Sequence, residues 1–143
     1  MKIRINVIML VLISLLLVGC NKKTKAETYE TFRDKHLGPQ TTFTQPEEEY
    51  YVYFYKDECP ACVKVQDLVF AQAKNKEMPL YFVNQVDVID FLARTDNRDY
   101  NNYGAQQFSE IKIFGFPTIV LIKNGMVIAQ FVGSTAITNE LGK

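Results

Sequence analysis

Apolar and polar residues alternate along this chain in runs whose spacing predicts its strands and helices. The longest run of β-forming side chains is Tyr50 to Tyr55, and it has large apolar or aromatic groups at odd and even positions alike. A strand with two apolar faces is typical of the centre of a sheet that is covered above and below. The pattern therefore predicts a central strand in a sandwiched sheet.

A helix is predicted directly after this strand. The polar break Lys56-Asp57-Glu58 is followed by a stretch, Cys59 to about Lys76, in which apolar side chains recur at helical spacing at Cys62, Val65, Val69 and Ala73. Leu80 to Asn84 has the composition of a second strand. Strand, helix and strand in this order predict a parallel β-α-β unit.

Two more strands are predicted near the end of the chain, at Thr118 to Ile122 and Met126 to Val132. They are separated by Lys123-Asn124-Gly125. Asn-Gly between two apolar runs favours a hairpin, because both residues tolerate the positive φ of a type I′ turn.

The remaining segments have weaker patterns. Glu27 to Leu37 has the composition of a short helix, and Gly38-Pro39 is a stop signal after it. Val88 to Leu92 and Ala105 to Ile111 are compatible with further helical turns, whereas residues 95–104 are dense in turn formers and predict a loop. Long loops inside compact domains are often functional or mobile.

The first twenty residues differ in kind from the rest. Lys2 and Arg4 give a positive start, and Ile5 to Val18 is almost wholly apolar, which is typical of an export signal. An uncleaved membrane helix is the alternative, but this run is shorter than the roughly 20 residues that a bilayer core requires.

Leu17-Val18-Gly19-Cys20 ends the apolar run and resembles the bacterial lipobox. The resemblance implies that residues 1–19 are a lipoprotein signal peptide and that Cys20 is acylated on its sulfur and becomes the mature N-terminus. Residues 20–27 then form a lipidated tether, and 28–143 form the folded domain on the extracytoplasmic face of the bacterial cell membrane. A free cysteine that happens to close a signal peptide is the alternative.

Composition supports one domain and excludes some functions. The chain has 143 residues, of which 48% are hydrophobic, enough for one core of ordinary size. Lysine plus arginine equals aspartate plus glutamate at 16 each, and no basic run is interleaved with aromatic residues. Nucleic acid is therefore not expected as a partner.

Three cysteines are an odd number for an exported protein, but acylation of Cys20 leaves one pair, Cys59 and Cys62. The Cys-x-x-Cys spacing serves zinc sites as well as redox sites. Zinc requires four ligands, and beyond this pair only Cys20 and the single histidine, His36, remain, so no metal is expected. A purely structural disulfide is disfavoured because it closes too small a loop to restrict the unfolded chain much. For His36, capping or surface packing is favoured over catalysis.

The placement of the pair favours redox chemistry without a cofactor. With Cys59 at the N-cap, Pro60 falls at the first helical position, where its fixed φ is suitable and its missing N–H costs nothing. The helix N-terminus favours a thiolate and so lowers the cysteine pKa. We expect Cys59 to point outward as the nucleophile and Cys62, one turn into the helix, to resolve the mixed disulfide.

The order and spacing of these segments resemble the thioredoxin superfamily. The resemblance spans roughly Glu49 to Leu141 and rests on Cys59-Pro60-Ala61-Cys62 after an aromatic strand, the strand at 80–84, Gly115 to Gly125, and Val132-Gly133. It implies an α/β thioredoxin fold, with a central mixed β-sheet flanked by helices. Among smaller relatives, the chain resembles the thioredoxin-like bacteriocin transport accessory proteins of Gram-positive bacteria.

The resemblance also implies a cis peptide bond between Phe116 and Pro117, packed beside the cysteine pair, with neighbouring backbone groups that hold an extended substrate segment. Such a bond is rarely accidental. The active site then comprises Cys59 and Cys62, with the loop around Pro117 as the substrate-binding part.

Four features depart from the family pattern. Glu58 precedes the first cysteine in place of tryptophan, and Tyr53 replaces a buried acid, which leaves proton transfer to Cys62 to water or to Glu58. An insertion of about fifteen residues lies between Asp87 and Pro117 and is expected to shape a substrate surface. After Gly133 only a short C-terminal helix fits, which exposes sheet that the family usually covers.

The leading functional hypothesis is a thiol-disulfide oxidoreductase that acts on thiols or disulfides of exported proteins or peptides, together with an unidentified redox partner. The alternative is a non-catalytic accessory lipoprotein that aids secretion or maturation of an exported peptide. The direction is expected to be reduction or isomerisation, because Ala61 brings no positive charge between the cysteines and Asp57 and Glu58 disfavour a thiolate if they lie near it.

Overall fold

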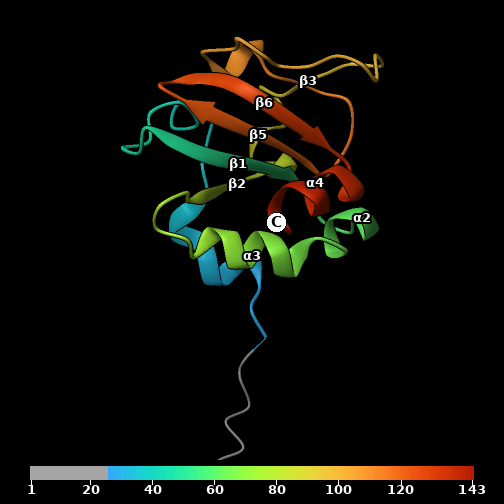
Figure 1. Cartoon of the computed structure of the whole chain (residues 1–143). Coiled ribbons are helices and arrows are strands. Elements are labelled where there is room, and N and C mark those ends of the chain that lie inside the picture. The colour runs from blue at the N-terminus through green and yellow to red at the C-terminus, as the bar shows by residue number, and fades with distance from the viewer. Residues whose placement is uncertain (1–25) are drawn as a thin grey trace, which may run out of the picture.

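The computed structural model describes residues 26–143, and its centre is a mixed four-stranded sheet (Figure 1). The predicted signal peptide and Cys20 lie outside the described residues. The strand order is β2-β1-β5-β6, with bounds Leu80–Asn84, Glu49–Tyr55, Thr118–Lys123 and Met126–Val132. The four strands predicted from the sequence are confirmed.

Strand β1 lies inside the sheet and pairs in parallel with β2 and antiparallel with β5. Its side chains alternate between two cores, Tyr50, Val52 and Phe54 on one face and Tyr51, Tyr53 and Tyr55 on the other. Both faces are buried, as the run of β-formers predicted. At the β5–β6 turn, Asn124 and Gly125 have φ of 51° and 73°, which confirms the hairpin.

Helices cover one face of the sheet. They are the 3₁₀ helix η1 (Tyr29–Lys35) and the α-helices α2 (Pro60–Val63), α3 (Gln66–Ala73) and α4 (Ser134–Leu141). Figure 1 shows α2, α3 and α4 on the same side of the sheet. Buried side chains from all of them meet the strands here, among them Phe32, Cys62, Val69 and Ile137.

The insertion covers the opposite face of the sheet. It contains η2 (Gln85–Val88), β3 (Ala93–Arg94), η3 (Phe108–Glu110) and β4 (Lys112–Ile113), and β3 pairs with β4 in a separate parallel ribbon. Val88, Leu92, Phe108 and Ile111 pack against the central strands. The insertion therefore acts as the second layer of the domain.

Hydrogen bonds of one buried side-chain amide fix the turn-rich part of the insertion in place. Asn102 is buried, its Nδ2 donates to the Lys112 carbonyl (3.0 Å), and its Oδ1 accepts from the Lys112 N–H (2.8 Å). From β6, Gln130 donates to the Tyr100 carbonyl (3.0 Å) and accepts from the Asn102 N–H (3.1 Å). These bonds tie the loop to the sheet.

One helix prediction needs correction, and three weaker ones hold as 3₁₀ helices or short turns. The predicted helix from Cys59 to about Lys76 is two helices. Helix α2 ends at Val63, and Val65, with φ −109° and ψ 1°, is the N-cap of α3. The predicted apolar stripe is nevertheless buried throughout. Glu27 to Leu37 and Ala105 to Ile111 form only the 3₁₀ helices η1 and η3, and the turns before Leu92 are likewise short.

The C-terminal helix α4 is short, as expected after Gly133, and ends at Leu141. Strand β6, at the edge of the sheet, is only half-buried along most of its length. Within residues 26–143, no helix is long and apolar enough to cross a bilayer.

Candidate active site at the Cys59–Cys62 disulfide

Cys59 and Cys62 are joined by a disulfide at the N-terminus of α2, with their Cα atoms 5.2 Å apart. Cys59 is the N-cap and Pro60 occupies the first helical turn, as the sequence predicted. The Cys62 N–H points at the Cys59 Sγ, 3.1 Å away. The helix therefore presents an N–H group to the sulfur on which a thiolate would form.

The expectation that Cys59 points outward is wrong for this oxidised state. Cys59 is 4% exposed and Cys62 is 3% exposed, so both residues are almost fully buried. The disulfide and the Cys62 N–H together hold the Cys59 sulfur against α2, where the apolar core of the helical face covers it. Ala61 packs against the same core.

A cleft of about 510 Å³ opens over the disulfide. It is lined by Tyr29, Lys56, Asp57, Glu58, Cys59, Pro60, Cys62, Val63 and Gln66. Val63 is 66% exposed and offers an apolar rim, while Lys56, Asp57 and Glu58 bring charge. Glu58 has φ of 52°, so the strand-to-helix loop turns sharply just before Cys59.

The Phe116–Pro117 peptide bond is cis. Phe54 pairs with Thr118 across β1 and β5, so Pro117 lies at the end of the sheet from which the cysteine loop leaves β1. Phe116 packs against both cores, including the one that contains the cysteines, and the Arg94 guanidinium lies 5.1 Å from its ring centroid. The structure thus gathers the cysteine loop and the Pro117 loop at one end.

Tyr53 occupies the position at which the thioredoxin pattern has a buried acid. Its side chain is fully buried among the residues that surround the disulfide. Among residues 26–143, its hydroxyl and that of Tyr29 are buried with no partner in hydrogen-bond geometry, although each phenol lies near enough to affect the pKa of the other. Burial, with the neighbouring Tyr29, raises the pKa of Tyr53, so this hydroxyl stays protonated at neutral pH.

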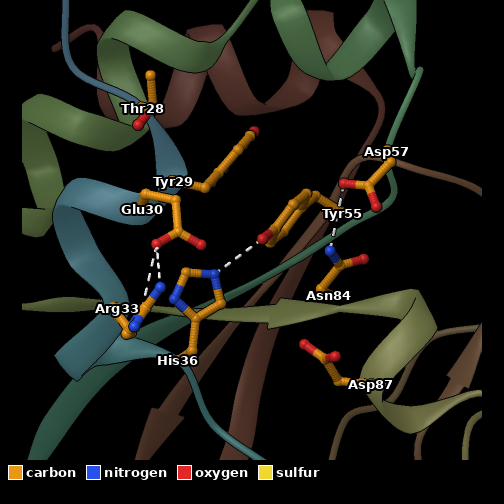
Figure 2. Close-up of a pocket in the computed structure, with 9 residues that line it drawn as sticks. All are labelled: Thr28, Tyr29, Glu30, Arg33, His36, Tyr55, Asp57, Asn84 and Asp87. Carbon is orange, nitrogen blue, oxygen red and sulfur yellow. Dashed lines mark hydrogen bonds and ion pairs between the residues drawn. The ribbon is translucent and has the colours of Figure 1, made fainter.

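A second cleft, also of about 510 Å³, adjoins the first and shares Tyr29 and Asp57 with it. Figure 2 shows its lining residues, Thr28, Tyr29, Glu30, Arg33, His36, Tyr55, Asp57, Asn84 and Asp87. The sequence did not reveal this cleft, because its residues come from η1, β1 and the end of β2, and only the fold brings them together.

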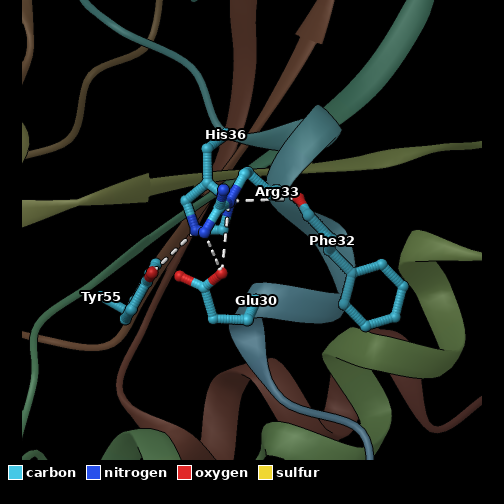
Figure 3. A network of polar contacts seen from close by, with 5 residues as sticks. All are labelled: Glu30, Phe32, Arg33, His36 and Tyr55. Atoms are coloured by element: carbon cyan, nitrogen blue, oxygen red, sulfur yellow. Dashed lines mark hydrogen bonds and ion pairs between the residues drawn. The ribbon is translucent and has the colours of Figure 1, made fainter.

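His36 fixes one wall of the second cleft (Figure 3). Its Nδ1 lies 3.0 Å from the Phe32 carbonyl and its Nε2 lies 2.8 Å from the Tyr55 hydroxyl. Because a carbonyl only accepts, Nδ1 carries a proton, and in neutral His36 the Tyr55 hydroxyl donates to Nε2. The carbonyl contact agrees with the capping role expected for His36.

No group of three or more histidine, cysteine, aspartate or glutamate side chains gathers in residues 26–143 in a way that would hold a metal ion. A buried pair of cysteines at a helix N-terminus, reached through an open cleft, is the arrangement of a redox dithiol protein.

Comparison with known families identifies the class. The sequence model of the thioredoxin-like domain family matches residues 40–140, and the chain belongs to this family. No curated protein matches the sequence closely enough to be counted as a relative. The thioredoxin superfamily resemblance and the α/β thioredoxin fold predicted from the sequence are both confirmed.

Solved structures agree on the fold. A Plasmodium falciparum thioredoxin is 16% identical with a TM-score of 0.51, and the match covers 76% of this chain and 93% of that one. The N21Q mutant thioredoxin of Halobacterium salinarum is 16% identical with a TM-score of 0.52, covering 75% and 83%. At these identities the likeness shows the fold. Fold, family and disulfide together support thiol-disulfide oxidoreductase chemistry in general.

Proposed function

We propose that this protein exchanges electrons with thiols or disulfides of exported proteins or peptides through Cys59 and Cys62. The observation that carries the proposal is the disulfide at the N-terminus of α2, under an open cleft. In the reducing direction, the Cys59 thiolate attacks a substrate disulfide and expels one substrate thiolate, which takes a proton from water. Cys62 then loses its proton and attacks Cys59, which releases the second substrate thiolate and leaves the pair oxidised.

The pair must be reset by a second redox partner, a dithiol donor if the protein works as a reductase. A reducing or isomerising direction is supported by Ala61, which brings no positive charge between the cysteines. Asp57 and Glu58 line the same cleft as Cys59 and together outweigh the single charge of Lys56 there, which disfavours a thiolate. Equilibration with glutathione buffers tests the direction: a reduction potential below about −200 mV supports it, and one near −120 mV contradicts it.

Location is proposed on the sequence alone. Cys20 would be acylated and would anchor the domain at the extracytoplasmic face of the membrane, where exported substrates pass. Mass spectrometry of the N-terminal peptide tests this, because an unmodified Cys20 or retention of residues 1–19 would contradict it.

Catalysis is tested by disulfide reduction in vitro. The double variant Cys59→Ser, Cys62→Ser is expected to lose thiol-driven reduction of a model disulfide protein. The matched control is Cys20→Ser, which removes the third thiol and leaves the redox pair, and it is expected to retain activity. Activity in the double variant would contradict the proposal.

The alternative, a non-catalytic accessory role, predicts instead that cells carrying the double variant secrete and mature their exported peptides normally.

A further inference from the structure

The second cleft adjoins the cleft over the disulfide. Tyr29 and Asp57 line both, so the two clefts meet at these residues. A polypeptide that places its disulfide over Cys59 therefore has a neighbouring side chain within reach of the second cleft.

The charges of this cleft are unbalanced. Arg33 and Glu30 form an ion pair, in which the Arg33 Nε lies 3.2 Å from a Glu30 carboxylate oxygen that its Nη2 also contacts. This pair uses Arg33, the only lysine or arginine in the lining. Asp57 and Asp87 remain, and within residues 26–143 neither forms an ion pair.

The two aspartates lie on the side of the cleft opposite the ion pair. Asn84 Nδ2 donates to an Asp57 oxygen (3.3 Å), which holds that carboxylate at the edge of β2, and Figure 2 shows Asp87 below it. Asp57 and Asp87 are both exposed, and both line this one cleft.

The wall between these charged groups is aromatic. Tyr29 stacks on Tyr55 with ring centroids 3.9 Å apart and planes 9° apart, and Tyr55 is only 2% exposed. His36 holds the Tyr55 hydroxyl at the cleft (Figure 3). Since Tyr55 is covered, the half-buried Tyr29 ring is the surface along which a long side chain can lay an apolar stem, with the carboxylates for its cationic head.

We propose that the second cleft is a subsite for a lysine or arginine side chain of the substrate polypeptide, near the cysteine that reacts with Cys59. This inference rests on the proposed function, because it adds a sequence preference to the same disulfide exchange. An acidic side chain is disfavoured, since the Asp57 and Asp87 carboxylates of the lining repel it.

The test compares three disulfide peptides that are identical except for one position near the reactive cysteine, which is lysine, glutamine or glutamate. The lysine peptide is expected to have the highest kcat/KM, by about five-fold over glutamine at low salt, mainly through KM. The preference is expected to shrink as ionic strength rises. Equal kcat/KM for the lysine and glutamate peptides would overturn the proposal.

Asp87→Asn and Asp90→Asn form the matched pair of variants. Both remove one exposed carboxylate from the same segment, but only Asp87 lines the cleft. Asp87→Asn is expected to bring the lysine-to-glutamine ratio towards one, and Asp90→Asn to leave it as in the wild type. Equal effects of the two variants would show a long-range field instead of a subsite, and would also overturn the proposal.

A binding measurement separates this inference from the proposed function. Cysteine-free versions of the three peptides are titrated by calorimetry into the oxidised wild-type protein. The lysine version is expected to bind more tightly than the glutamate version whether or not turnover occurs. If no disulfide peptide is turned over but the lysine version still binds preferentially, the catalytic proposal fails and the subsite stands. If turnover occurs without any charge preference, the reverse holds.

Discussion

At the scale of single residues, the two cysteines have the same burial in the oxidised protein but different positions in the helix. Cys59 is the N-cap and accepts an N–H bond on its sulfur, whereas Cys62 lies within α2. We expect the N-cap sulfur to be the more reactive of the two in the reduced protein, because the Cys62 N–H points at it.

Cys62→Ser is expected to trap a mixed disulfide between Cys59 and a substrate, because no second thiol remains to resolve it. The trapped species is detected as a thiol-sensitive band after mixing with a disulfide-containing protein. Timed alkylation of the reduced wild-type protein provides a check, since Cys59 is expected to react before Cys62. Faster modification of Cys62 would reverse the two roles.

Tyr53→Phe tests the buried hydroxyl beside the disulfide. This hydroxyl has no hydrogen-bond partner among residues 26–143, so its removal is expected to leave the free energy of unfolding unchanged or to raise it by up to about 1 kcal/mol. Tyr51→Phe is the matched control on the same face of β1. It removes a 2.8 Å bond to Glu140 and is expected to cost about 1 kcal/mol. Urea unfolding measures both, and a larger loss in Tyr53→Phe would mean that the hydroxyl is bonded.

At the scale of elements, strands were easier to predict than helices. The β1 run and the Asn124-Gly125 turn carry strong local signals, a two-faced run of β-formers and two residues that accept positive φ. The helical stripe after Cys59 was right in its buried positions but not in its continuity. Apolar spacing reports which side chains face the core, and it does not report a single non-helical residue such as Val65.

The insertion shows another limit of local pattern. Its density of turn formers predicted a loop, but not that Asn102 would be buried and bonded to Gln130 and Lys112. The partners of Asn102 are 10 and 28 residues away along the chain. Tertiary contacts determine whether such a polar side chain is buried and hydrogen-bonded, so the spacing of residues along the sequence cannot predict it.

Ile137→Ala tests how much the short helix α4 contributes. Ile137 is the only fully buried side chain of α4 and packs into the core that contains the cysteines. Its truncation is expected to lower the free energy of unfolding by about 2 to 4 kcal/mol, through lost burial and a cavity. Thr138→Ala, at the exposed neighbouring position, is the control and is expected to change little. Similar small effects of both variants in urea unfolding would mean that α4 is not docked as described.

At the scale of the whole molecule, the candidate site was only half visible in the sequence. Cys59, Cys62 and the Pro117 loop were found because each lies in a short motif. The second cleft was not, because Tyr29, Tyr55 and Asp87 come from three separate segments that meet only in the fold. The core beside the disulfide is rich in tyrosine, and we therefore expect the free energy of unfolding to depend on pH in the alkaline range.

Burial raises the pKa of Tyr51, Tyr53 and Tyr55 in the core beside the disulfide and of Tyr81 in the core on the opposite face of the sheet, whereas in the unfolded chain these phenols ionise near pH 10. A raised pKa in the folded state contributes stability that is complete below about pH 10 and is lost as the pH rises beyond it, because only the unfolded chain then releases these protons. Urea unfolding of the oxidised protein is expected to show a loss of about 1 kcal/mol per buried tyrosine between pH 9 and pH 11. Tyr53→Phe is expected to reduce that loss, and Tyr103→Phe, at a ring that is 68% exposed, to leave it unchanged. A free energy of unfolding that is flat over this range, or an equal effect of the two variants, would contradict the buried tyrosines as the cause.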